Sequence, residues 1–184
     1  PRLFHGSTVE QVAAGGGDDP RADGVMTDCP LLGLSITQAD CQAAILYDPV
    51  NHALANIHCG WKGSVANIYQ SAVLRMRAAY GTHPADILAC ISPALGPASS
   101  EFVHWRTELP EQFSEFQHRT NYFDFWAISE KQLIDAGLQC HHIEIARIDT
   151  FRDEDFFSYR RDKLCGRHAT VCALLENKQF QGRP

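Results

Sequence analysis

The sequence lacks the patterns that mark membrane and secreted proteins. No apolar run approaches the roughly 20 residues that a membrane span needs, and the first residues do not follow the pattern of a secretory signal peptide. None of the seven cysteines forms a Cys-x-x-Cys spacing. We therefore expect a cytoplasmic protein with free thiols, most of them buried as small hydrophobic side chains in a reducing compartment. The cysteines are Cys29, Cys41, Cys59, Cys90, Cys140, Cys165 and Cys172.

Positive charge is also scarce. The formal net charge is −6, with 45% hydrophobic and 21% charged residues over 184 positions. This balance is typical of a globular domain and argues against a protein that wraps nucleic acid. A local basic pocket for a small anion remains compatible with it. A chain of this length is expected to form one domain that buries about 70% of its unfolded surface.

The glycine-rich segment 15–17 lacks the Gly-Lys-Ser/Thr that completes a phosphate-binding loop. We therefore expect a surface loop there.

The hydrophobic pattern predicts strands and helices that mix without strict alternation. Helices are expected at 64–80, where Gly81 ends the pattern, at 110–116, and at 124–136, between Asp124 as N-cap and Gly137 as stop signal. Strands are expected in a short stretch ending at residue 12 and at 22–27, 31–36, 87–91, 143–148 and 169–175. The fold class is therefore α/β in the mixed α+β sense: central mixed β-sheets flanked by helices, in a single domain spanning 1–184.

A β-hairpin is expected around Asp48-Pro49-Val50-Asn51, whose residues favour a turn. If the chain folds about the Pro49–Val50 bond, Cys41 lies directly opposite His58, with Cβ atoms roughly 4.5–5.5 Å apart. A thiolate and an imidazole at that separation suit zinc. Both faces of the hairpin are mostly apolar, so we expect it to be covered on both sides.

A catalytic zinc usually has three protein ligands and an open fourth position. His5, next to Gly6, and His104, next to Trp105, are the candidates for the third ligand. The alternative is a core with hydrogen-bonded histidines and a buried free thiol.

Three further residues could act on a substrate near this hairpin. Asp40 could serve as a general acid or base, although it points away from Cys41 unless a bulge re-aims it. Arg160, in the aromatic and basic segment 156–163, and Lys62, after the hairpin, could hold a phosphate. Solvated surface positions are the alternative for all three.

These residues fall in motifs that resemble the YfiH-like family, also called laccase-domain or multicopper polyphenol oxidoreductase proteins. The segment Phe4-His5-Gly6 is similar to the family's Val-His-Gly element, which favours His5 as the third ligand. The other matching motifs are Thr37-Gln38-Ala39-Asp40-Cys41, His58-Cys59-Gly60-Trp61-Lys62-Gly63, Gly96-Pro97, Phe156-Phe157-Ser158-Tyr159-Arg160-Arg161 and Gly166-Arg167.

The resemblance implies zinc held by His5, Cys41 and His58 in an enzyme that takes purine nucleosides and phosphate as partners, with no nucleic acid and no membrane. The implied reactions are phosphorolysis of adenosine, inosine, guanosine or methylthioadenosine, and deamination of adenosine. On this hypothesis Asp40 transfers a proton in deamination, and Arg160 or Lys62 holds the phosphate.

Two alternatives stay open. Copper is possible in place of zinc, but a laccase needs His-x-His pairs, and the sequence has none. A non-enzymatic zinc module would close its coordination shell with Cys59 or His104.

The sequence departs from the family in two places. The family carries a further segment ahead of Val-His-Gly, so we expect that this segment is missing here. Asp149-Thr150 stands where the family usually has Cys-Thr.

Overall fold

A computed structural model describes residues 1–13 and 20–176, so the loop expected at 15–17 lies outside the described residues. The described strands are β1 (Val9–Gln11), β2 (Gly24–Thr27), β3 (Leu34–Gln38), β4 (Gln42–Asp48), β5 (Ala53–Cys59), β6 (Leu88–Ile91), β7 (Gln117–Arg119), β8 (Tyr122–Phe123), β9 (Ile143–Ile145) and β10 (His168–Cys172). The α-helices are α1 (Trp61–Val65), α2 (Ile68–Tyr80), α3 (Trp105–Glu108) and α4 (Phe125–Asp135). Short 3₁₀ helices cover Pro84–Asp86, Glu111–Phe116 and Cys140–His142.

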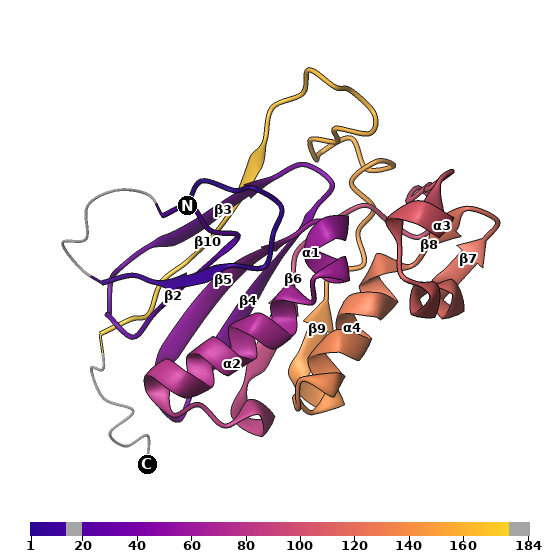
Figure 1. Cartoon of the computed structure of the whole chain (residues 1–184). Coiled ribbons are helices and arrows are strands. Elements are labelled where there is room, and N and C mark those ends of the chain that lie inside the picture. The colour runs from indigo at the N-terminus through magenta and orange to yellow at the C-terminus, as the bar shows by residue number, and fades with distance from the viewer. Residues whose placement is uncertain (14–19, 177–184) are drawn as a thin grey trace, which may run out of the picture.

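A six-stranded mixed sheet forms the centre of the molecule, with strand order β1-β2-β5-β4-β6-β9 (Figure 1). The outer pairs β1–β2 and β6–β9 are parallel, and the inner pairs are antiparallel. Two small antiparallel sheets, β3–β10 and β7–β8, complete the fold. This arrangement confirms the predicted mixed α+β class with a central mixed sheet.

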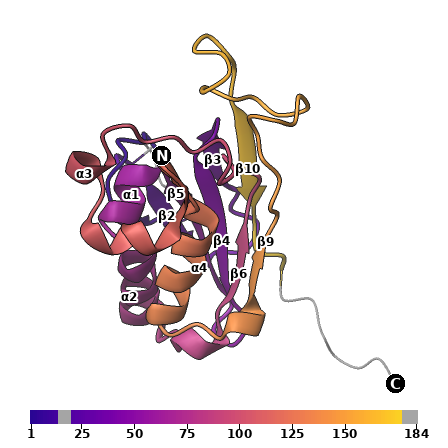
Figure 2. The same cartoon turned by 90° about the vertical axis from the view of Figure 1, so that its right-hand side faces the viewer.

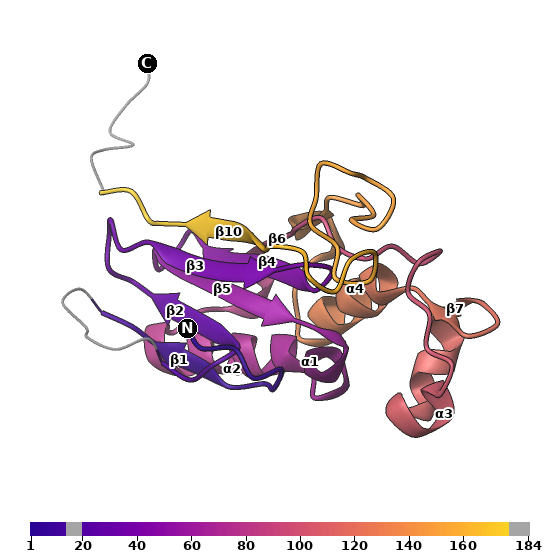
Figure 3. The same cartoon turned by 90° about the horizontal axis from the view of Figure 1, so that it is seen from above.

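The central sheet is covered on both faces, as expected for its apolar hairpin. Helices α2 and α4 lie on one face and the β3–β10 ribbon on the other (Figures 2 and 3). Every residue of β5 is buried as a result. The side chains between sheet and helices include Ile57, Ile68, Met76 and Leu133, all fully buried. Burial on both faces lets a polar residue in β5 sit in a dry, fixed environment.

The hairpin forms, but its predicted register is wrong by two residues. Ala43, not Cys41, lies opposite His58. The difference arises at the turn, because Asp48 pairs with Ala53 and leaves four residues in the loop. The Asp48 carboxylate accepts hydrogen bonds from the backbone N–H groups of Val50 (2.9 Å) and Asn51 (3.0 Å), which stabilises this longer turn. An even shift leaves each side chain on its predicted face.

The single helix predicted at 64–80 is two helices, α1 and α2. Asn67 interrupts it with a left-handed φ of 50°, and its side chain accepts a hydrogen bond from Gln70 N at 3.2 Å. Asn tolerates this backbone conformation and is a preferred N-cap, which explains the break. The predicted end at Gly81 is confirmed by its φ of 73°, and the predicted cap at Asp124 by its bond from Ala127 N.

The remaining expectations differ from the structure in detail. The segment predicted as a helix at 110–116 is a 3₁₀ helix, and the strands expected to reach residues 148 and 175 end at Ile145 and Cys172. The expectation that most cysteines are buried is wrong. Cys59 is buried, whereas Cys90 is exposed because β6 alternates exposed and buried positions. In the part of the chain that the structure describes, no helix has the length and apolar character to cross a membrane.

Candidate metal centre and adjoining pocket

Three side chains from separate segments meet at the end of the hairpin: those of His5, Cys41 and His58. Their candidate ligand atoms all lie within 4.8 Å of one another. His58 comes from β5, Cys41 lies just before β4, and His5 lies in the N-terminal loop. One thiol and two imidazoles are ligands that suit zinc, and copper also accepts them. The structure therefore brings together the three residues named as metal ligands.

Gly60 explains how these side chains approach so closely. It follows Cys59, which pairs with Gln42 at the end of the ladder, so it lies beside Cys41. A Cβ at this position would lie 3.1 Å from Cys41 Sγ and 3.3 Å from His5 Cδ2. Only glycine leaves this space free without moving a ligand.

Asp23 fixes the two histidines, and the sequence analysis did not identify it. It is fully buried, and its Oδ1 accepts hydrogen bonds from His58 Nδ1 (3.0 Å) and from His5 N (2.9 Å). Its Oδ2 accepts one from Gly6 N at 2.6 Å. The bond from His58 Nδ1 leaves Nε2 free for a metal, which is the usual arrangement around metal-binding histidines. The signal that could have identified Asp23 is a carboxylate near the start of the mostly apolar segment 22–27.

The protonation states follow from burial and these contacts. Burial works to raise the pKa of Asp23, but the hydrogen bonds from His58, Gly6 and His5 outweigh it and lower the pKa. Burial, with Cys59 and Asp40 adding to it, raises the pKa of the Cys41 thiol to about 12. Burial and the neighbouring His58 lower the pKa of His5. Asp23 is thus ionised and His5 neutral, and a cation would have to displace the Cys41 proton.

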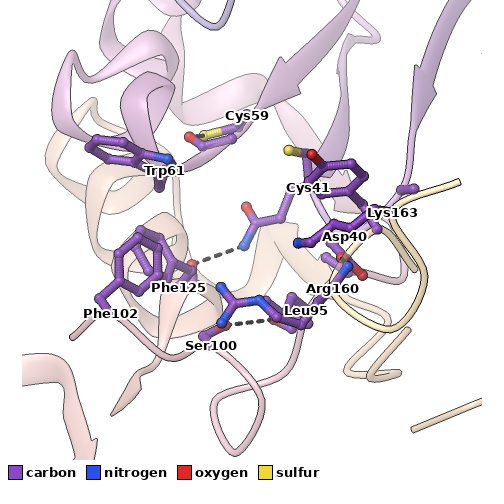
Figure 4. A pocket seen from close by; sticks show the side chains of 15 residues that line it. Asp40, Cys41, Cys59, Trp61, Leu95, Ser100, Phe102, Phe125, Arg160 and Lys163 are labelled. Atoms are coloured by element: carbon purple, nitrogen blue, oxygen red, sulfur yellow. Dashed lines mark hydrogen bonds between the residues drawn. The ribbon is translucent and has the colours of Figure 1, made fainter. Parts of the chain in front are cut away.

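A cavity of about 380 Å³ adjoins this centre and shares Cys41 and Gly60 with it. Trp61, Phe102 and Phe125 lie on one side of the cavity, and Asp40 and Lys163 lie on the other (Figure 4). The ring of Phe102 contacts the other two, with centroids 6.0 Å apart for Trp61–Phe102 and 5.2 Å apart for Phe102–Phe125. The cavity therefore joins a flat apolar surface to a charged one.

Asp40 points toward the cavity because of its backbone. Its φ of 79° lies in the left-handed region, between the end of β3 and the start of β4. The carboxylate accepts hydrogen bonds from Thr150 Oγ1 (2.8 Å) and from Arg160 N (2.6 Å). A turn of the backbone, rather than a bulge in a strand, thus directs this side chain, and it ties the segment around Arg160 to the sheet.

The two cations predicted for phosphate binding lie in different places. Arg160 lines the cavity, and its Nη1 and Nη2 both donate to the Glu101 carbonyl, at 3.1 and 3.2 Å. Lys62 lies outside the cavity lining, exposed, with its ammonium 5.4 Å from the Trp61 ring. The lysine on the cavity is Lys163, whose Nζ lies 4.1 Å from the Tyr159 ring. Lys163 belongs to the aromatic and basic segment 156–163, but the sequence analysis did not single it out, because its place on the cavity depends on the path of the loop.

The remaining candidates do not belong to the group of three ligands. Cys59 Sγ contacts Ser64 Oγ at 3.3 Å, and His104 is exposed before α3. Asp149, which departs from the family pattern, accepts a hydrogen bond from Ser99 Oγ at 2.6 Å and lies outside the cavity lining. Among the described residues, His5, Cys41 and His58 form the one group with metal-ligand geometry.

Comparison with known proteins identifies the family of the chain. Residues 1–175 match the family described as "Multi-copper polyphenol oxidoreductase laccase". The chain is similar to proteins named purine nucleoside phosphorylase from Bacteroides thetaiotaomicron (33% identity over 76% of this chain and 55% of the relative) and Streptomyces coelicolor (36% identity over 90% and 70%). It spans little more than half of the first of these relatives.

Solved structures show the same fold. The crystal structure of the Bacillus licheniformis hypothetical protein YfiH superposes with a TM-score of 0.85 at 27% identity, covering 94% of this chain and 72% of that one. YlmD from Geobacillus stearothermophilus gives a TM-score of 0.84 at 26% identity, covering 95% and 74%.

Proposed function

Because the chain belongs to the multi-copper polyphenol oxidoreductase laccase family, also known as the YfiH family, we propose that it is a metal-dependent purine nucleoside phosphorylase. One observation carries this proposal. The His5, Cys41 and His58 centre opens onto a cavity that is lined both by aromatic rings and by the cations Arg160 and Lys163. A purine nucleoside can pack on the aromatic rings, and phosphate can bind the cations.

Zinc is the metal that the residues fit best. The ligand types, the free Nε2 of His58 and the space left by Gly60 all support it. When bound, zinc would supply a Lewis acid that stabilises negative charge developing on the reacting groups. Asp23 would hold the imidazole of His58 in the tautomer that binds the metal.

We assign the two cations that line the cavity, Arg160 and Lys163, to phosphate binding. The guanidinium of Arg160 has five N–H groups, of which two are used by the Glu101 carbonyl. The remaining N–H groups and the Lys163 ammonium can hold phosphate oxygens, whereas Lys62 lies outside the cavity lining. In phosphorolysis a phosphate oxygen forms a bond to ribose C1′ while the bond from C1′ to N9 breaks. The purine leaves with the electron pair and takes up a proton from the medium.

The position of Asp40 supports a second proposed reaction at the same site, the deamination of adenosine. Its carboxylate faces the cavity that also contains Cys41, and there it can pass a proton between water and the 6-amino group. Phosphorolysis requires phosphate, whereas deamination requires water alone. Release of ammonia from adenosine in phosphate-free buffer therefore separates the two reactions.

Copper-dependent oxidation of phenols is the alternative that the family description raises. The described residues contain one group of three ligands, which is a site for a single ion. A multicopper oxidase needs several such sites. The structure of the described residues therefore favours phosphorolysis over laccase chemistry.

The proposal is tested with inosine and phosphate. Zinc-loaded protein should release hypoxanthine only when phosphate is present. Cys41→Ala should lose both zinc and turnover, whereas Cys90→Ala, which removes an exposed cysteine, should keep both. Full turnover by Cys41→Ala would contradict the proposal, and phenol oxidation by a copper-loaded protein without phosphorolysis would favour the laccase alternative.

A further inference from the structure

Gln42 lines the cavity, and its carboxamide is held by three hydrogen bonds inside the protein. The residue is buried, with 4% of its surface exposed. Oε1 accepts from Tyr69 Oη at 2.8 Å and from Ser129 Oγ at 2.5 Å. Nε2 donates to the Phe125 carbonyl at 2.9 Å, the bond drawn to Phe125 in Figure 4. The amide is therefore fixed to both α2 and α4.

The chemistry of these partners determines which end of the amide is nitrogen. A backbone carbonyl can only accept, so the group facing Phe125 O must be the N–H donor. A flipped amide would place two acceptors against each other. The two hydroxyl groups of Tyr69 and Ser129 then use both lone pairs of Oε1, so the carbonyl end of Gln42 has no capacity left.

One hydrogen-bonding group of the amide remains. Nε2 carries two N–H groups, and only one has an acceptor among the residues that the structure describes. Since Gln42 is almost fully buried and lines the cavity, we assign the second N–H to a molecule bound in the cavity. Gln42 thus presents a donor, and no acceptor, to whatever binds there.

The anchor of the Gln42 amide lies on the side of the cavity that suits a purine base. Its anchor, Phe125, belongs to the aromatic side of the cavity together with Trp61 and Phe102 (Figure 4). A flat heterocycle packs on such rings. Asp40 and Lys163 lie on the opposite side and suit the polar part of a nucleoside.

We propose that Gln42 is a specificity-determining residue that favours 6-oxopurines over 6-aminopurines, an inference that rests on the proposed purine nucleoside function. The oxygen at C6 of hypoxanthine or guanine accepts a hydrogen bond, whereas the amino group at C6 of adenine donates. A free glutamine reads adenine with both ends of its amide, donating to N7 and accepting from N6. Gln42 cannot do so, because Tyr69 and Ser129 already occupy its oxygen.

The test is the ratio of dissociation constants for hypoxanthine and adenine, measured by calorimetry on the full chain. The native protein should bind hypoxanthine about tenfold more tightly than adenine, as expected for one hydrogen bond. Gln42→Met should reduce this ratio to about twofold or less. Gln132→Met is the matched control, because Gln132 is another buried amide, donating to Ser64 O at 2.7 Å, but lies outside the cavity lining. It should keep the native ratio.

A second variant keeps the test decisive if Gln42→Met does not fold, which its melting curve will show. Gln42→Glu has the same shape and can still accept from Tyr69 and Ser129, but it has no second N–H, so it should narrow the ratio by lowering the affinity for hypoxanthine. Equal binding of the two bases by the native protein, no binding of either, or an unchanged ratio in a folded variant would overturn the role of Gln42. A tenfold ratio without phosphorolysis of inosine would contradict the proposed function while supporting base selection by Gln42.

Discussion

The metal centre and the loop at residues 149–167 lie on one cavity but are held in place by different means. His58 belongs to the fully buried strand β5, and Asp23 lies next to β2, whose residues are all buried. The loop contains no helix or strand. It is held by Arg161, whose Nη1 donates to the carbonyls of Thr150 (3.0 Å) and Phe151 (2.9 Å).

This difference matches the chemistry assigned to each region. Metal ligands need a fixed geometry, which strand β5 supplies for His58 and the buried Asp23 supplies for His5. A phosphate group accepts donors from several directions, so cations on a loop suffice. In both regions one aspartate makes the critical connection: Asp23 orients His58, and Asp40 holds the backbone of Arg160. The experiments below test whether the two regions can be damaged separately.

Loss of the Asp23 carboxylate should have the largest effect, because it disturbs two metal ligands at once. Asp23→Asn is expected to weaken zinc binding about 100-fold, since groups that orient metal-binding histidines contribute at that level. Competition with a chromophoric chelator measures the affinity. Asp48→Asn is the control: Asp48 is also fully buried but lies at the opposite end of the hairpin, and its loss should leave zinc affinity unchanged. Equal affinity in Asp23→Asn and the native protein would contradict the assignment.

Loss of the Arg160 guanidinium should weaken phosphate binding and leave the metal centre unchanged. Arg160→Ala is expected to raise the KM for phosphate about tenfold, as for a hydrogen bond to a charged group. The KM for inosine and the zinc content should change little. Steady-state kinetics with each substrate varied in turn checks this, with Arg152→Ala as control on an exposed arginine of the same loop. Equal increases in both KM values would remove the proposed role.

A methyl group at position 60 should produce a smaller effect, again confined to the metal centre. Gly60→Ala places a Cβ 3.1 Å from Cys41 Sγ, so a ligand must move and zinc affinity should fall about fivefold. Gly33→Ala serves as control because nothing lies within 4 Å of a Cβ there. Unchanged zinc affinity in Gly60→Ala would show that the centre is less rigid than the packed strands suggest.

The turn of the hairpin should show a pH effect without any change in metal binding. Burial works to raise the pKa of Asp48, but the hydrogen bonds that its carboxylate accepts from Asn51 and Val50 outweigh burial and lower the pKa. A lowered pKa in the folded state stabilises the protein above the unfolded value of about 3.9, and this contribution is lost as the pH falls through the folded pKa. The difference in unfolding free energy between native protein and Asp48→Asn, measured with urea between pH 6 and about pH 3, should therefore shrink toward the acidic end. A constant difference would contradict the pKa shift.

Local signals in the sequence predicted local structure well. The cap at Asp124 and the end at Gly81 depend on neighbouring residues only, and both are confirmed. The hairpin was also correctly placed. Its register was not, because Asp48 stabilises a longer turn than the Pro49–Val50 bond suggested.

The parts of the site that depend on distant contacts were missed for a physical reason. Asp23 is 35 residues away from His58 in sequence, and no spacing rule links them. The role of Gln42 depends on Tyr69 and Ser129, which reach it from two different helices. His5 was favoured by family resemblance, whereas the residues alone left His104 as its competitor for the third ligand.

The most direct test of the account is a titration of metal-free protein with zinc, followed by release of hypoxanthine from inosine and phosphate. We expect turnover to rise in proportion to bound zinc and to stop rising at one ion per chain, because His5, Cys41 and His58 form one group of ligands. Turnover that does not depend on zinc, or zinc binding that brings no phosphate-dependent release of base, would contradict the account.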